Sequence, residues 1–135
     1  MNGVYDLQIL ELAVRHSLRR QTKFLNGLSR SIESYVTPPV GWKAIKDAGK
    51  ALFSPEKGGS YLVFEKRPLD PRISEYCAQD IFLLFDLEAA LRRSFGPWGL
   101  NWEGRITAAS TARVARARSS VYEGAGRHRA IAPAI

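Results

Sequence analysis

Cysteine and histidine are scarce in this sequence. Among its 135 residues Cys77 is the only cysteine, and the two histidines, His16 and His128, lie far apart. A single cysteine excludes a disulfide within the chain and favours a reducing compartment. The same scarcity predicts that the chain holds no structural zinc ion, because such a site needs four Cys or His ligands. We expect both histidines at ordinary surface or helix-end positions.

Long apolar runs are missing as well. No stretch of about 18 apolar residues occurs, so we expect no membrane-spanning helix and no membrane partner. The opening residues MNGVYDLQIL lack the basic segment and apolar run of a secretory signal. The sequence therefore predicts an intracellular protein, cytoplasmic or nuclear.

Acidic residues are outnumbered, with 13 Asp and Glu against 20 Lys and Arg, which gives a net charge of +7. The excess is densest in residues 97–135, which hold six arginines and two glutamates. A basic surface attracts nucleic acid or anionic membrane. Equally, a basic surface and tail can simply be solvated. Both interpretations apply to Arg113, Arg116, Arg118, Arg127 and Arg129.

Hydrophobic periodicity predicts a mostly helical chain with at most one or two short strands. Helices are expected over residues 4–16, 23–36, 41–53, 71–95 and 101–118. The segment 60–65, SYLVFE, reads as a strand or as the approach to the next helix, and residues 119–135 as a mobile tail. In the helix over 41–53, the apolar residues are expected on one side and three lysines (Lys43, Lys46 and Lys50) on the other. The tryptophans Trp42, Trp98 and Trp102 are expected to be core or interface anchors.

The helix over 71–95 is the most clearly marked. Asp70 can cap its start and Pro71 suits its first position. At 100° per residue from Ile73, the apolar arc runs from about 320° at Leu87 to about 40° at Cys77. Asp80 falls at about 340°, inside this arc. A helix that buries this arc therefore has to accommodate a carboxylate.

A charged carboxylate is strongly disfavoured in an apolar setting. Asp80 can pair with Arg or Lys from another helix, stay protonated, or face a cleft and bind a metal ion. Tyr76 lies one turn earlier, at about 300°, beside Asp80. A phenol so placed can touch a water bound to a metal held by the carboxylate, and so orient it for attack on a phosphodiester.

The segment EKRPLDPRISEYCAQDIFLLFDL resembles the third motif of the DEDDy-type 3′–5′ exonucleases, the ribonuclease D-like group of the ribonuclease H-like fold. Within this group, the sequence looks most like that of fungal members. The matching positions are Arg67, Pro68, Leu69, Glu75, Tyr76, Ala78, Asp80, and Leu83 or Leu84. The earlier segment VYDLQILELAVR looks like the part of the family that follows the second motif.

This resemblance implies specific roles. Asp80 would be a ligand of the catalytic divalent metal, Mg²⁺ or Mn²⁺, and Tyr76 would orient the attacking water. Arg67 could approach the backbone of the nucleic acid, RNA or DNA. Residues 1–96 would form the C-terminal portion of the α/β exonuclease domain without most of its sheet, with the third motif at 67–84. Residues 97–118 would follow as a basic helix and 119–135 as the tail.

The sequence departs from the family in its carboxylates. The family chemistry uses four of them on two metal ions, beginning with Asp-x-Glu on a strand, where the two side chains share one face. The only Asp-x-Glu here, Asp86–Leu87–Glu88, lies within the expected helix and after the third motif. We therefore expect the catalytic set to be incomplete, no stably bound metal, and no cleavage of nucleic acid by this chain alone. The alternative is a non-catalytic basic module that binds nucleic acid or a protein partner.

Overall fold

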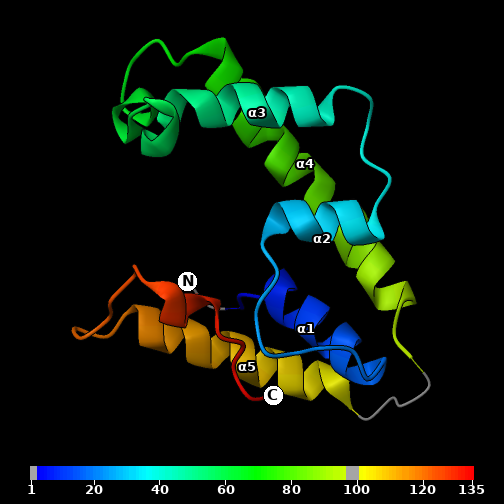
Figure 1. The fold of residues 1–135 in the computed structure, drawn as a ribbon. Coiled ribbons are helices and arrows are strands. Elements are labelled where there is room, and N and C mark those ends of the chain that lie inside the picture. The colour runs from blue at the N-terminus through cyan, green and yellow to red at the C-terminus, as the bar shows by residue number, and fades with distance from the viewer. Residues whose placement is uncertain (1–2, 97–100) are drawn as a thin grey trace. The chain divides into compact units, whose positions relative to one another are not determined.

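The computed structural model describes residues 3–96 and 101–135, and these are mostly helical (Figure 1). The α-helices are α1 (Leu7–Ser17), α2 (Leu28–Tyr35), α3 (Trp42–Phe53), α4 (Pro71–Arg93) and α5 (Trp102–Ala117). Short 3-10 helices follow at η1 (Pro55–Lys57), η2 (Tyr61–Phe64) and η3 (Arg127–Ala130). Within the described ranges the β structure amounts to one isolated bridge, between Phe24 and Ile131. None of the described helices combines the length and hydrophobicity needed to cross a membrane.

The start that Asp70 and Pro71 predict for the helix over 71–95 is confirmed, and the helix expected over 4–16 begins at Leu7, directly after the capping residue Asp6. The backbone N–H of Gln8 donates to Asp6 Oδ1 over 2.9 Å, and that of Arg72 donates to Asp70 Oδ1 over 2.9 Å. Each aspartate thereby satisfies an N–H that the first turn leaves without a partner. The helix over 71–95 exists as α4 and ends at Arg93.

Two local predictions need correction. The helix expected over 23–36 begins only at Leu28. The guanidinium of Arg15 binds the carbonyls of Gln21 (2.6 Å) and Phe24 (2.9 Å), and this ties the preceding segment into an irregular path. The strand considered for 60–65 is instead the 3-10 helix η2, whose first turn is capped by Ser60.

The chain divides into two compact units, which are described separately. Unit 1 comprises residues up to Tyr35 together with Leu87–Ile135, and unit 2 comprises Val36–Asp86. Helix α4 contributes its first part to unit 2 and its last turns to unit 1. The sequence-based division at residues 96 and 118 rests on the family resemblance and stays a prediction.

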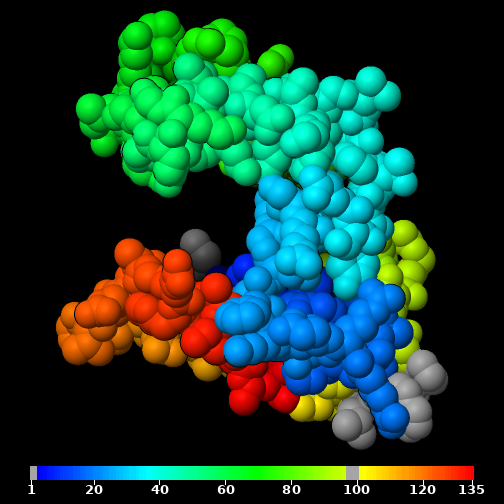
Figure 2. All heavy atoms as spheres, viewed as in Figure 1, coloured from blue at the N-terminus to red at the C-terminus, as the bar shows by residue number. Residues whose placement is uncertain are grey.

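Unit 1 is built around α1. Ile9, Leu10, Leu12, Ala13 and Val14 of this helix are fully buried. Helix α5 packs beside α1 (Figure 1), where Arg113 forms an ion pair with Asp6 over 2.6 Å. The C-terminal segment lies against the residues that follow α1 (Figure 2, red against blue). Backbone hydrogen bonds from Leu25 to Ala130 (2.8 Å) and from Ala132 to Lys23 (3.0 Å) hold it there, so the last part of the expected tail is attached, while residues 119–128 are exposed.

A buried ion pair lies within α1. Glu11 and Arg15 are buried, with Arg15 Nη2 2.8 Å from Glu11 Oε2. Asn26 and Tyr35 also donate to Glu11 Oε1, over 2.9 and 3.2 Å. A buried charge pair is tolerable only when its remaining hydrogen-bonding capacity is used. These contacts use the remaining capacity of Glu11, and they join α1 to the segment between α1 and α2 and to the end of α2.

Unit 2 is organised around the contact of α3 with the first part of α4. A Cβ atom added at Gly49 would lie 2.5 Å from Tyr76 Cδ2, so the glycine allows the two helices to approach closely. Phe53 lies edge-on to Tyr76 at 5.3 Å and also contacts Tyr61 and Phe64 of η2. Trp42 is buried here, as Trp102 is in unit 1, while Trp98 lies outside the described residues.

Candidate functional site

Tyr76 and Asp80 lie one turn apart on α4, as their spacing predicted, and both belong to unit 2. The Tyr76 ring is packed between Gly49 and Phe53. Burial, followed by the nearby negative charge of Asp80, raises the pKa of the Tyr76 phenol above its ordinary value of 10. The phenol is therefore neutral near pH 7 and able to donate a hydrogen bond.

Asp80 has a cationic partner from another helix, the first of the three arrangements considered for it. Lys46 Nζ of α3 lies 3.0 Å from Asp80 Oδ1. The side chain of Lys46 is only 7% exposed and that of Asp80 is 24% exposed. The expected separation of the lysines from the apolar side fails at Lys46, because its ammonium turns toward α4 and lies 5.4 and 5.3 Å from the ring centres of Trp42 and Tyr76.

The donor set around Asp80 does not fit a two-metal centre. Within residues 3–96 and 101–135, no group of three or more His, Cys, Asp or Glu side chains is arranged to hold a metal ion. One oxygen of Asp80 already accepts from the Lys46 ammonium. The pair Asp86 and Glu88 lies within α4, where residues two apart diverge by about 200°. No step through a metal ion can be assigned to these residues.

Arg67 is exposed, and its guanidinium binds its own part of the chain. Nη1 donates to the carbonyls of Phe64 and Lys66, each over 2.9 Å. These bonds link the end of η2 to the approach to α4. The contact of Arg67 with nucleic acid stays a prediction.

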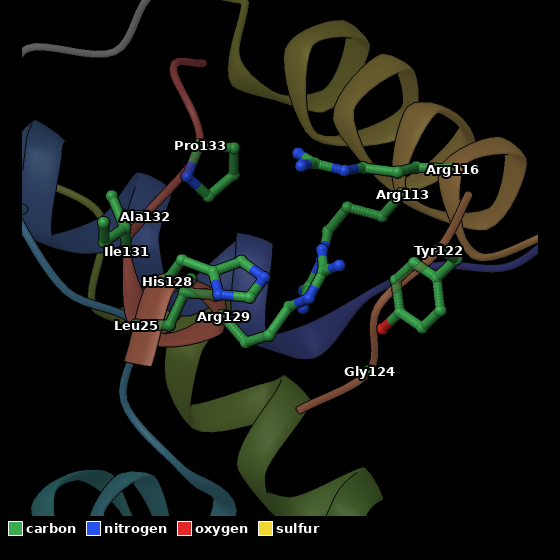
Figure 3. Close-up of a pocket in the computed structure, with 10 residues that line it drawn as sticks. All are labelled: Leu25, Arg113, Arg116, Tyr122, Gly124, His128, Arg129, Ile131, Ala132 and Pro133. Carbon is green, nitrogen blue, oxygen red and sulfur yellow. The ribbon is translucent and has the colours of Figure 1, made fainter. Parts of the chain in front are cut away.

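The structure brings together a second set of residues whose meeting the sequence did not show. Arg113 and Arg116 of α5 line a cavity in unit 1 with His128 and Arg129 of η3 (Figure 3). Its volume is about 340 Å³. The signal in the sequence was the density of arginine after residue 97. That signal does not show which arginines share a cavity, because the segments meet only through tertiary packing.

Comparison of the chain with protein-family models, curated proteins and solved structures finds no match.

Proposed function

We propose that this chain is part of a DEDDy-type 3′–5′ exonuclease domain that does not hydrolyse nucleic acid by itself. The observation that carries the proposal is the position of Asp80. It lies on the helix that follows the Arg67–Leu69 segment and one turn after Tyr76, as in the family's third motif, yet it is bound to Lys46.

A second feature of α4, an exposed apolar surface, supports the proposal that this chain is part of a larger domain. Ile81, Phe82 and Phe85 are 64%, 72% and 76% exposed. A contiguous apolar surface on a helix marks a site where something else packs. In a complete ribonuclease H-like domain, helices of this kind cover a sheet, and an uncovered face is what a chain without most of that sheet would show.

The inactivity follows from the chemistry of the donors. A two-metal mechanism needs carboxylates that place both ions against the attacking and leaving oxygens. Asp80 supplies one carboxylate, and the Lys46 ammonium competes with any cation for it. Tyr76 keeps the capacity to donate a hydrogen bond, but a phenol alone does not activate water.

Nuclease activity tests this proposal directly. The purified chain would be incubated with a 5′-labelled oligonucleotide in Mg²⁺ or Mn²⁺, beside its Asp80→Ala and Tyr76→Phe variants. We expect no shortening of the oligonucleotide by any of the three proteins. Progressive 3′ shortening by the wild type, lost in Asp80→Ala, would show that the chain completes a catalytic site and would refute the proposal.

The second candidate function is a non-catalytic module that binds nucleic acid. The arginine-lined cavity of unit 1 favours it. This function needs no metal ligand, so it is compatible with the ion-paired state of Asp80. Its test is binding rather than cleavage.

A further inference from the structure

The cavity of unit 1 is formed by segments that are far apart in the chain. Helix α5 supplies Arg113 and Arg116, the segment after it supplies Tyr122 and Gly124, and η3 supplies His128 and Arg129. The apolar part of the lining is formed by Leu25, Ile131, Ala132 and Pro133. Figure 3 shows the arginine side chains extending into this space from two sides. Cationic groups and an apolar wall therefore share one concave surface.

The charge in the cavity is only partly compensated. None of the described lining residues is acidic. Arg113 has its own partners, Asp6 Oδ2 at 2.6 Å and Gln8 Oε1 at 3.1 Å, so it is largely committed to the packing of α1 on α5. Arg116 and Arg129, in contrast, form no ion pair with any other described residue. Two guanidinium groups thus remain to attract an anion.

The guanidinium group of Arg129 is held in one orientation by Tyr122. Its guanidinium carbon lies 4.3 Å from the ring centre of Tyr122, a stacking arrangement that holds the planar group in place. Its Nε is buried and has no hydrogen-bond partner among the described residues. Because Nε is buried, an anion in the cavity would bind the terminal nitrogens of this guanidinium, for which an anionic oxygen is the best acceptor.

We propose that this cavity binds a phosphate group of a single-stranded nucleic acid, with Arg116 and Arg129 as the contacting cations. Planar guanidinium groups match the geometry of phosphate oxygens. The apolar wall of Leu25, Ile131 and Pro133 suits the adjoining sugar or base. A volume of about 340 Å³ admits one nucleotide of a flexible strand, whereas a rigid duplex presents its phosphates on a convex surface. The inference rests on the second proposed function and supplies its binding site.

The cleanest variant is Arg116→Ala, because this side chain is exposed and no interaction within the described part of the chain depends on it. Arg129→Ala is the second variant, and Arg129→Lys keeps the charge while losing the planar fork. The matched control is Arg93→Ala, which removes one exposed charge from the end of α4 in the same unit and does not line the cavity.

Binding would be measured by fluorescence anisotropy with a labelled oligo-dT strand at several salt concentrations. For the wild type, log Kd plotted against log salt should rise linearly. Arg116→Ala and Arg129→Ala should each lower this slope by about 0.7, the loss of one single-strand phosphate contact. Arg129→Lys should recover the slope but bind more weakly, and Arg93→Ala should match the wild type. Circular dichroism checks that each variant is folded.

Several outcomes would overturn the proposal. A loss of slope in Arg93→Ala equal to that in Arg116→Ala would show that net charge alone drives binding. Competition by inorganic phosphate at concentrations equal to those of the oligonucleotide would assign the site to a free anion. Stronger competition by duplex than by single strand would exclude the fit to a flexible strand. A negative nuclease result leaves this binding test intact, so failure of either proposal can be recognised separately.

Discussion

The ion pair between Lys46 and Asp80 yields a quantitative prediction about the stability of unit 2. Asp80→Asn removes the negative charge with little change of shape. The Lys46 ammonium, with its side chain 7% exposed, would then lie against a neutral amide and the rings of Trp42 and Tyr76. A buried cation without a counter-charge is strongly unfavourable, so the variant should be less stable.

The size of the loss follows from the burial of the two partners. Breaking a fully buried ion pair costs about 3–5 kcal/mol. Asp80 is 24% exposed, so water can reach part of the site and soften the penalty. The two aromatic rings also retain some attraction for the ammonium. We therefore expect Asp80→Asn to lower the free energy of unfolding by about 1–3 kcal/mol.

Urea unfolding followed by circular dichroism would measure this loss. Lys46→Met alone and combined with Asp80→Asn would complete a double-mutant cycle, with a coupling energy of about 1–3 kcal/mol. The control is an exposed ion pair within α3, the helix that also carries Lys46. Its partners, Lys43 and Asp47, are 3.4 Å apart and 76% and 52% exposed. Replacing Asp47 by Asn should change the stability by less than about 0.5 kcal/mol.

Two results would refute this reasoning. If Asp80→Asn and Asp47→Asn had equal effects on the unfolding midpoint, Lys46 would not depend on Asp80. If millimolar Mg²⁺ or Mn²⁺ raised the midpoint of the wild type but not that of Asp80→Asn, the carboxylate would serve as a metal ligand. The second result would also weaken the proposal that the chain is inactive.

Two further predictions concern the packing of each unit. Gly49→Ala should destabilise unit 2 despite the better helix propensity of alanine, because the new Cβ would lie 2.6 Å from Tyr76 Cβ and Cγ. In the same urea titration, Gly104→Ala in α5 should be neutral or stabilising, because its new Cβ would meet no atom closer than 3.7 Å. Burial, and then the charge of Arg105, lowers the pKa of His16 below 6.5. The free energy of unfolding should therefore fall as the pH drops through 6.5. His16→Gln should flatten this dependence in thermal melts from pH 5 to 8. An unchanged pH profile in His16→Gln would contradict the second prediction.

Much of the secondary structure could be predicted because its causes are local. The start of α4 follows from Asp70 and Pro71, two neighbouring residues whose capping and backbone preferences need no tertiary context. The position of Asp80 within an apolar arc follows from the period of the helix alone. The start of α2 could not be found in this way, because the side chain of Arg15 binds the preceding backbone and overrides its helical pattern.

In the candidate sites, too, some features follow from the sequence and others depend on tertiary packing. The sequence by itself determined that Tyr76 and Asp80 share one face of a helix, and that arginine accumulates toward the C-terminus. Only the tertiary structure decided that Lys46 neutralises Asp80, because the contact joins residues 34 positions apart on two helices. Packing likewise decided that Arg116 and Arg129 line one cavity, since this requires residues 130–132 to pair with 23–25. Periodicity records which residues share a face of one helix, whereas the choice of opposing surface depends on packing across the whole unit.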